Sequence, residues 1–408
     1  MTEALAPRRP GDPLAVTRHA LAPPGGRSRA GLGLSAMAAQ GRFGLQVCAE
    51  CGAVQYPPRE VCHECLGGVL AWRDVAAGGR LIAMTTVRIS ADPYFRAHTP
   101  WRTGTVALDC GPAVVTHVHG DAMAGGRVRM ILRLDRSGQG VMVAMPAEDT
   151  ADMMDDPILR EMTCDPRGRR VLVTDGRNAF GQAMAHAMLD GGAAQVFVGV
   201  ADLWKPFAGQ EGMAGDMVPL DLSDSGGVRE MAASLGGRID IVVNTALRIR
   251  PGGVLQRQDV VDARVEMEAA YFGPLRLAQA LGPVLQARAA DGDYGACAWV
   301  DVHSVAALAP EPGFSANAAA QAAGLSLSVS LRHALAPIRV LTALVGPLDD
   351  AWHQDVPPPK VSPAALAAAV VRGLREGLEE IVVGDIAMDV MRRWRDNPST
   401  LARERAGG

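Results

Sequence analysis

Four cysteines form two C-x-x-C pairs in the first part of the chain. They are Cys48, Cys51, Cys62 and Cys65, and ten residues separate the two pairs. Four thiolates at this spacing can close a tetrahedral zinc site on two short knuckles. Because cysteine would take all four coordination positions, neither water nor substrate would have an open place at the metal. The spacing therefore predicts a structural zinc ion, not a catalytic one.

The segment that holds these cysteines resembles a known family. The knuckle sequence Tyr56-Pro57-Pro58-Arg59 lies between the two pairs, Trp72 follows them, and a β-rich stretch continues to Met145-Pro146. Over residues 36 to about 147 the chain resembles the rubredoxin-like zinc-ribbon/OB-fold proteins associated with acyl-CoA enzymes. Members of that family accompany thiolases or related acyl-CoA enzymes as accessory subunits. The resemblance implies a thiolase-type acyl-CoA enzyme as a partner.

Residues 170–408 resemble the short-chain dehydrogenase/reductase (SDR) family over almost their whole length. A first strand ends at Thr174, and Asp221-Leu-Ser-Asp224 matches the acidic motif on the adenine side. Asp240-Ile-Val-Val-Asn244-Thr-Ala stands where the family usually has Asn-Asn-Ala-Gly. The resemblance implies a Rossmann-type sheet and an NAD(P) cofactor.

The phosphate-binding turn departs from the family pattern. Where the family has T-G-x-x-x-G-x-G, this chain has Thr-Asp-Gly-Arg-Asn-Ala-Phe-Gly, from Thr174 to Gly181. Asp175 puts a carboxylate where phosphate should pass, which at a dielectric near 20 and about 5 Å disfavours each phosphate charge by roughly 3 kcal/mol before screening. We therefore expect NAD(P) to bind weakly. The residues that the resemblance implies for it are Thr174, Gly176, Gly181, Asp221 and Asn244.

The catalytic positions of the family are also replaced. The family uses an Asn on a long helix, a Ser at the end of the next strand, and a Tyr-x-x-x-Lys motif beyond it. Only Ser304 is retained, while Ala270, Asn317 and Gln321 occupy the Asn, Tyr and Lys positions. A carboxamide has no usable proton near pH 7, so Asn317 cannot be the acid or base of a carbonyl reduction.

No other side chain of this half supplies the missing pair. Its only tyrosines are Tyr271 and Tyr294 and its only lysines are Lys205 and Lys360, and none of them has Tyr-x-x-x-Lys spacing. His303, beside Ser304, is a conceivable substitute base, but a single histidine at a strand end is more often structural. The replacements predict an SDR fold that does not catalyse hydride transfer on its own.

The elements around these residues divide the chain into two folded parts. A short helix is expected from Ala36 to Leu45, ahead of β-prone runs broken by glycine, which are typical of a small barrel. These runs are Arg80–Ile89, Thr103–Leu108, Ala113–His119 and Arg127–Leu134. We predict a zinc ribbon plus OB-fold over residues 36–147.

Strand-like and helix-like stretches alternate in the second part. The predicted strands are Val171–Thr174, Gln195–Val200, Ile239–Asn244, Ala298–Val302, Arg339–Val345 and Glu380–Val383. Alternation with buried apolar strands predicts an α/β domain with a doubly wound parallel sheet over residues 169–408. The Ala-rich stretches Ala269–Leu285 and Ala316–Leu335 resemble the helices that pair SDR subunits, and we expect Ala320 and Ala323 in that interface. The alternative is that these Ala-rich helices are part of the core.

Two segments show no such pattern. Residues 1–35 are rich in Pro, Gly and Arg and are expected to be flexible, with a mitochondrial transit peptide as the alternative. Residues 148–168, acidic and containing proline, are expected to form a linker between the two cores.

Composition narrows the class of partner. The net charge of −4 and the eleven arginines against ten acids within residues 36–150 argue against nucleic acid. No apolar run is long enough to span a membrane, and paired C-x-x-C cysteines fit a reducing cytoplasm.

Together these features predict a non-catalytic subunit in acyl-CoA metabolism, in a homo- or hetero-oligomer. Its SDR-like half would pair with an active 3-hydroxyacyl-CoA dehydrogenase, and its ribbon/OB half with a thiolase-type enzyme. The alternatives are an active NAD(P)-dependent dehydrogenase with an atypical site and a ligand-sensing or nucleic-acid-binding regulator.

Overall fold

A computed structural model describes residues 21–26, 28–151, 153–291 and 295–405. Its contacts divide these residues into two compact units, and the chain passes from one to the other between Cys164 and Asp165. The short segment Arg375–Glu379 belongs with the first unit. Residues 1–20, most of the expected flexible segment, lie outside the described residues. From Arg29 onward the chain is folded, as the 3₁₀ turn η1 (Arg29–Gly31) and the helix α1 (Leu32–Ala39), so the helix begins earlier than its apolar pattern suggested.

The ribbon is a three-stranded antiparallel sheet in the order β2-β1-β3. Its strands are β1 (Gly44–Cys48), β2 (Val54–Gln55) and β3 (Leu70–Asp74). Inside it, the buried Gln55 amide donates to Gln46 Oε1 at 3.0 Å, and the same oxygen accepts from the Arg59 backbone N–H at 2.8 Å. These bonds attach the loop between the cysteine pairs to the sheet.

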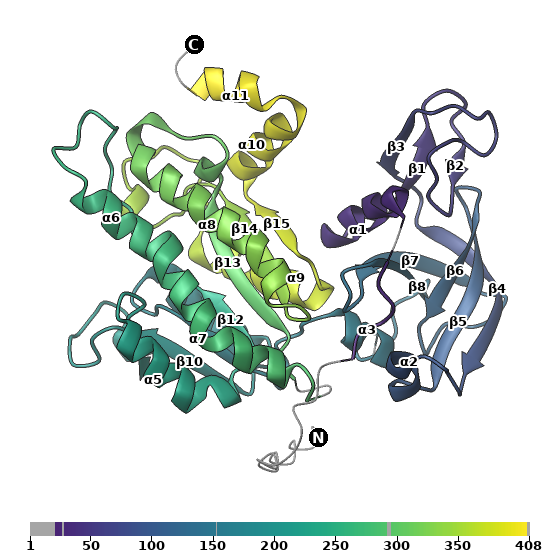
Figure 1. Cartoon of the computed structure of the whole chain (residues 1–408), viewed down its shortest axis with the longest axis horizontal. Coiled ribbons are helices and arrows are strands. Elements are labelled where there is room, and N and C mark those ends of the chain that lie inside the picture. The colour runs from purple at the N-terminus through teal and green to yellow at the C-terminus, as the bar shows by residue number, and fades with distance from the viewer. Residues whose placement is uncertain (1–20, 27, 152, 292–294, 406–408) are drawn as a thin grey trace. The chain divides into compact units, whose positions relative to one another are not determined.

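A closed five-stranded barrel follows the ribbon (Figure 1). Its strands, in the order β4-β5-β6-β8-β7, are β4 (Gly78–Val87), β5 (Trp101–Leu108), β6 (Ala113–Val118), β7 (Arg127–Leu134) and β8 (Gly140–Pro146). The predicted runs Ala113–His119 and Arg127–Leu134 correspond to β6 and β7, along which buried residues alternate with more exposed ones. β8, which is buried almost continuously, lies in the β-rich stretch that was not divided into strands.

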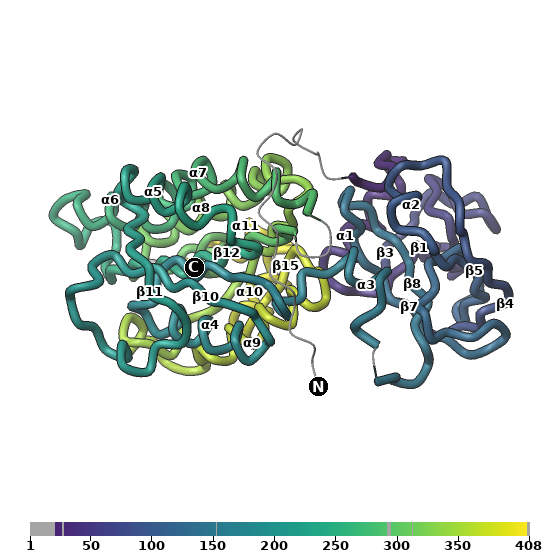
Figure 2. The backbone as a smooth tube through the Cα atoms, turned by 90° about the horizontal axis from the view of Figure 1, so that it is seen from below, coloured from purple at the N-terminus to yellow at the C-terminus, as the bar shows by residue number. Residues whose placement is uncertain are grey.

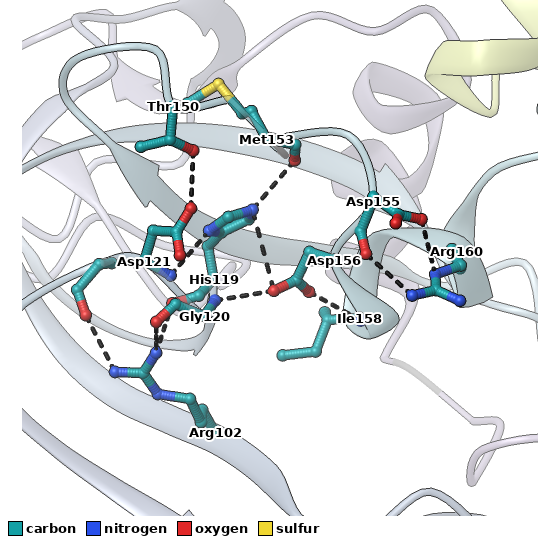
Figure 3. Close-up of polar contacts among 11 residues, drawn as sticks. Arg102, His119, Gly120, Asp121, Thr150, Met153, Asp155, Asp156, Ile158 and Arg160 are labelled. Carbon is teal, nitrogen blue, oxygen red and sulfur yellow. Dashed lines mark hydrogen bonds and ion pairs between the residues drawn. The ribbon is translucent and has the colours of Figure 1, made fainter. Parts of the chain in front are cut away.

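Much of the expected linker packs on this barrel. Asp156 begins helix α3 (Pro157–Met162), accepting from Ile158 N–H at 2.8 Å and from the barrel's Gly120 N–H at 2.7 Å (Figure 3). His119 Nε2 donates to the Met153 carbonyl at 3.0 Å, and both His119 and Asp156 are buried. The apolar residues of α3 complete a small core with the barrel: Ile158, Leu159 and Met162. The acidic composition concealed this packing because Asp156 is a helix cap here, not a solvated charge.

The second unit contains a seven-stranded parallel sheet in the order β11-β10-β9-β12-β13-β14-β15. The strands are β9 (Arg170–Val173), β10 (Gln195–Val200), β11 (Asp216–Pro219), β12 (Ile241–Asn244), β13 (Ala298–Ser304), β14 (Arg339–Val345) and β15 (Glu380–Val383). The predicted mixed α/β architecture, with ribbon, barrel and Rossmann-type sheet, is confirmed.

Helices cover both faces of the sheet, with α5, α7 and α8 on one side and α4 and α9 on the other (Figure 2). Their bounds are α4 (Ala179–Asp190), α5 (Ser225–Leu235), α6 (Val261–Met267), α7 (Gly273–Arg288), α8 (Ser315–Ala334), α9 (Pro363–Glu376), α10 (Asp385–Asp396) and α11 (Pro398–Arg405). Ala320 points into this unit's core and is fully buried, so the expectation that it lies in a subunit interface is wrong. Ala322 and Val329 are on the exposed face of α8 instead.

Candidate functional site

The four cysteines converge at one end of the ribbon. Their Sγ atoms all lie within 4.8 Å of one another, with Cys48 3.6 Å from Cys65 and Cys51 3.6 Å from Cys62. A tetrahedral site with Zn–S bonds of about 2.3 Å places its sulfurs about 3.8 Å apart. The arrangement therefore fits zinc, and the four ligands leave no coordination position for substrate.

The pKa values of these thiols indicate that the four cannot all ionise without a cation beside them. Backbone N–H groups of Cys65 and Glu64 lower the pKa of the Cys62 thiol to about 6. The Gly67 N–H lowers the pKa of Cys65, but the sulfurs of Cys51 and Cys48 raise it by more, to about 12. Four thiolates this close repel one another, so a divalent cation is needed to keep all four ionised.

In the second unit a cleft of about 610 Å³ opens at the carboxyl ends of β9, β10 and β12. Strand order reverses between β9 and β12, which is where doubly wound sheets bind their ligands. Predicted cofactor residues Thr174 and Asp221 line the cleft, and Asn244 is buried beside it, its Oδ1 3.2 Å from Thr174 Oγ1. Gly181 lies in the first turn of α4, where an added Cβ would be 1.8 Å from the Asp175 carbonyl oxygen. The fold therefore needs glycine there, with or without a cofactor.

The turn at the start of α4 satisfies its own hydrogen-bond donors. Asn178 caps the helix, its Oδ1 accepting from Gly181 N–H at 2.8 Å. The Asp175 carboxylate accepts from Arg177 N–H at 2.9 Å and from the Asn178 amide at 3.2 Å. Gly176 is closed in by Val198, whose Cγ1 would be 2.2 Å from an added Cβ. The Arg177 and Gly181 N–H groups, which could donate to a phosphate, are thus engaged within the chain.

Asp175 is in an environment that disfavours its charge. Burial raises the pKa of its carboxyl, against the opposing effects of the Arg177 N–H, the Asn178 amide and the charges of Arg177 and Arg248. The carboxylate and its two arginines resemble, in charge, a phosphate with its cationic partners. Arg248 also stacks over Trp352 at 5.8 Å from the ring centroid, and both residues line the cleft.

Ser304, Asn317 and Gln321 meet around a cavity of about 60 Å³ at the ends of β13 and β14. Gln321 Oε1 accepts from the Ser304 backbone N–H at 3.1 Å, and the Asn317 amide donates to the Arg248 carbonyl at 3.1 Å. Ser304 Oγ accepts from Ala306 N–H at 3.1 Å, capping a 3₁₀ turn. All three side chains thus have roles in holding the local backbone.

Ala270 lies apart from this cavity, in a π-helical turn, η4 (Glu268–Phe272), between α6 and α7. π-turns within helices occur frequently at functional sites. α8 approaches this turn closely because residue 324 is glycine: an added Cβ there would be 2.5 Å from the Ala270 carbonyl oxygen. An alanine at this position carries no polar group that could take part in a proton relay.

His303 lines the same cavity and belongs to a buried chain of polar groups. Its Nε2 is 2.8 Å from Ser328 Oγ, and Ser328 donates to Asp301 Oδ2 at 2.7 Å. Because Ser328 gives its proton to Asp301, it must accept from His303, which places a proton on Nε2 of the imidazole. Burial lowers the pKa of His303, against the opposing effects of the Asp301 charge and a hydrogen bond with Gln321. The ring is therefore engaged with α8.

Comparison with known families decides the identity of both halves. Residues 35–71 match the family described as "ChsH2, rubredoxin-like zinc ribbon domain", and residues 72–133 match "ChsH2, C-terminal OB-fold domain". Residues 169–357 match the family described as "short chain dehydrogenase". The chain is a fusion of ChsH2-type ribbon and OB-fold domains with an SDR domain. The predicted resemblance of the two halves to these families is confirmed.

Two solved short-chain dehydrogenases are similar to part of this chain. A short-chain dehydrogenase from Burkholderia cenocepacia J2315, described in complex with NADP, is 28% identical with a TM-score of 0.52, over 59% of this chain and 98% of its own. A short-chain dehydrogenase from Streptomyces avermitilis is 25% identical with a TM-score of 0.47, over 58% of this chain and 95% of its own. A comparison with curated proteins finds no match to this chain.

The features of this site that the sequence interpretation missed are mostly caps. Asn178 stands within the degenerate phosphate-binding motif, and asparagine directly before a helix is a common N-cap. Ser328 and Asp301 gave no signal, because their contact joins α8 to β13 across 27 residues of sequence. Within the described residues no helix is both long and apolar enough to cross a bilayer.

Proposed function

We propose that this chain is a non-catalytic accessory subunit in acyl-CoA metabolism. Its SDR domain would pair with an active 3-hydroxyacyl-CoA dehydrogenase, and its ribbon/OB domains would bind a thiolase-type enzyme. The dehydrogenase oxidises a β-hydroxyacyl-CoA to the β-ketoacyl-CoA that a thiolase cleaves, so one scaffold would hold consecutive enzymes together. The ribbon/OB resemblance supports the thiolase side of the proposal.

The observation that carries the proposal is the pair of carboxamides at the family's Tyr and Lys positions. Asn317 and Gln321 have no group that ionises near neutral pH, so neither can act as a general acid or base, and both bond to backbone groups. Loss of a general acid or base alone lowers a rate by about 10²- to 10⁴-fold. The 60 Å³ cavity at Ser304 is also far below the roughly 300–1,000 Å³ of ordinary ligand sites.

The turn before α4 supports the same conclusion for the cofactor. A dinucleotide phosphate would have to displace the Asp175 carboxylate from Arg177 N–H, or be repelled by it. We therefore propose weak binding of both NAD and NADP.

Exposed apolar side chains support a pairing role for the SDR domain. Val261 and Val265 lie one helical turn apart on α6, Phe272 follows in η4, and Val329 is exposed on α8. Because α6 and η4 both contact α8, these side chains lie on adjoining elements, and an exposed apolar surface there would suit a protein partner. A two-fold interface built on them would bury upward of about 2,000 Å² if it is obligate.

An active dehydrogenase with an atypical site is the second candidate. Two observations favour it: the 610 Å³ cleft is open, and the relative from Burkholderia cenocepacia is described in complex with NADP. In that case another group, not yet recognised, would have to act with Ser304.

One assay distinguishes the two candidates. The purified full chain is mixed with NAD or NADP and a β-hydroxyacyl-CoA, and reduced cofactor is followed by absorbance. We expect no turnover above background, and the same result for Ser304→Ala. Robust turnover that Ser304→Ala abolishes would establish the enzyme and overturn the accessory-subunit proposal.

Co-expression tests the partners directly. The chain is produced with a thiolase-type enzyme and an intact 3-hydroxyacyl-CoA dehydrogenase of the same organism and analysed by size-exclusion chromatography. We expect a complex that contains all three proteins. Val265→Arg should release the dehydrogenase and leave the thiolase bound.

A further inference from the structure

The second zinc knuckle carries three apolar side chains that this chain leaves exposed. Val61 is 47% exposed, Leu66 75% and Val69 60%. They surround Cys62 and Cys65 within the segment Glu60–Val69, which together with Glu50 we call the ribbon tip. The tip is therefore an apolar projection beside the zinc site.

Leu66 is the most informative of the three. It is the one residue other than glycine with a positive φ, at 62°, within the described residues. Its N–H donates to the Cys62 carbonyl at 3.1 Å, and Cys62 N–H donates to the Gly67 carbonyl at 2.9 Å, so the knuckle itself imposes this conformation. Glycine or asparagine would adopt it at lower cost than a leucine.

No packing within the chain compensates for the conformational cost of the positive φ at Leu66. With three quarters of its surface exposed, the Leu66 side chain contributes little to any core of this chain. A residue that costs conformational energy and is not packed points to a role outside the chain's own stability. Contact with another protein is the role that suits an exposed leucine.

The surroundings of the tip set the charge of that partner. Between residues 49 and 69 there are three acids, Glu50, Glu60 and Glu64, against the single cation Arg59. The three glutamates are exposed, and the Glu50 carboxylate lies over Gly67, 2.5 Å from the position of an added Cβ. An apolar tip with an acidic rim is complementary to an apolar pocket edged by arginine or lysine.

We propose that the ribbon tip inserts into an apolar, arginine- or lysine-rimmed pocket on the thiolase-type partner, with Leu66 as its central anchor. This inference rests on the proposed function and names the surface through which the ribbon/OB half would bind. The tip is held by the zinc knuckle and its backbone bonds before binding, so little ordering is needed when it docks. Buried anchors of this kind dominate interface energies, whereas rim charges mainly set association rate and salt dependence.

The test uses the full chain and a thiolase-type enzyme of the same organism, with affinity measured by titration calorimetry. Leu66→Gly should weaken binding by about 10- to 100-fold, as loss of an interface anchor does. The same substitution should leave zinc content at wild-type level and the unfolding temperature of the ribbon equal or higher, because glycine suits a positive φ. Leu66→Asn, which also tolerates this conformation, is the second variant.

Two further variants separate the anchor from its rim. Glu64→Lys should weaken binding at low salt and have a smaller effect at high salt. Val115→Ser, which removes a side chain 69% exposed on β6 outside the tip, is the matched control and should bind as the wild type.

The outcomes distinguish a failure of the ribbon-tip proposal from a failure of the accessory-subunit proposal. If the wild type binds and both Leu66 variants bind equally well, the ribbon tip is not the docking surface, while the accessory-subunit proposal stands. If Leu66→Gly loses zinc, the Leu66→Asn variant with full zinc takes its place. Weakened binding by that variant supports the ribbon tip as the docking surface, and wild-type binding overturns it. If the wild-type chain binds no thiolase-type enzyme, both proposals are overturned.

Discussion

Asp175 distinguishes this turn from the phosphate-binding turn of the SDR family. In place of a glycine that leaves room for phosphate, the chain has a carboxylate that accepts from Arg177 N–H and from the Asn178 amide. Asn178 in turn caps α4 through Gly181 N–H. Two neighbouring side chains thus occupy donors that would otherwise face an anion.

Replacing Asp175 by glycine should therefore strengthen NADP binding. At an effective dielectric near 20, removing half of a repulsion of roughly 3 kcal/mol corresponds to about tenfold in affinity. Titration of the purified chain with NADP measures the dissociation constant. Asp175→Asn, which removes the charge but keeps an acceptor, should give a smaller gain. Equal affinities for all three proteins would show that Asp175 does not limit cofactor binding.

At the scale of elements, close approaches between backbones decide the shape of the site. α8 passes so near η4 that Gly324 has the Ala270 carbonyl on one side and the His303 ring on the other. α3 is attached to the barrel by Asp156 and by Glu161, which is buried despite its charge. Both contacts join segments far apart in the sequence.

Gly324→Ala should destabilise the SDR domain. The added methyl would be 2.5 Å from a backbone oxygen and 2.9 Å from His303 Cε1, and overpacking of this kind costs about 1–3 kcal/mol. Chemical denaturation followed by circular dichroism measures the loss. Gly237→Ala, where nothing lies within 4 Å of the new Cβ, is the control and should change stability little. A wild-type midpoint for Gly324→Ala would mean that α8 can shift away from η4.

The attachment of α3 should depend on pH through His98. Glu161 accepts from His98 Nε2 at 3.2 Å and pairs with Arg136 Nε at 2.8 Å, and the bond to Glu161 raises the pKa of His98 above its usual 6.5. Because the folded pKa is the higher one, the pair stabilises fully below about pH 6.5, and this contribution is lost as pH rises through the folded value.

Thermal unfolding of the barrel unit between pH 6 and pH 9 tests this linkage. His98→Gln should lower the midpoint at pH 6 and converge with the wild type at high pH. His186→Gln, in the SDR domain, should leave the barrel transition unchanged at every pH. Parallel curves for His98→Gln and wild type would show that His98 is not charged in the pair.

At the scale of the whole molecule, the chain consists of two units with separate cores. The ribbon is a small three-stranded sheet that can bury little apolar surface of its own. Its four cysteines converge on one site, so metal binding should contribute much of its folding energy. The SDR domain has a large apolar core on both faces of its sheet.

Zinc removal should therefore affect one unit. Metal analysis should give one zinc per chain, and Cys62→Ser should lose the metal and unfold the ribbon while the SDR domain keeps its unfolding transition. Calorimetry of both proteins shows the transitions separately. Far less than one zinc in the wild type, or loss of both transitions in Cys62→Ser, would contradict the prediction.

Local patterns along the chain were enough to predict several features. Ligand spacing from Cys48 to Cys65 depends on two short loops, and strand-helix alternation after residue 170 follows from periodic burial, so the metal site and the α/β architecture could be inferred without coordinates. The replacements at Asn317 and Gln321 were likewise visible as a spacing from Ser304, although their effect on catalysis stays a prediction.

Tertiary structure alone decided what depends on contacts between distant segments. Composition marked residues 148–168 as solvated, yet Asp156 and Glu161 are buried because partners at Gly120, His98 and Arg136 satisfy their charges. Ala320 lies in an Ala-rich helix like those that pair SDR subunits. The packing of α8 on the sheet nevertheless places Ala320 on the face that is buried in the core. Helical period shows which residues share a face, and only the packed neighbours determine whether that face meets the core, solvent or another protein.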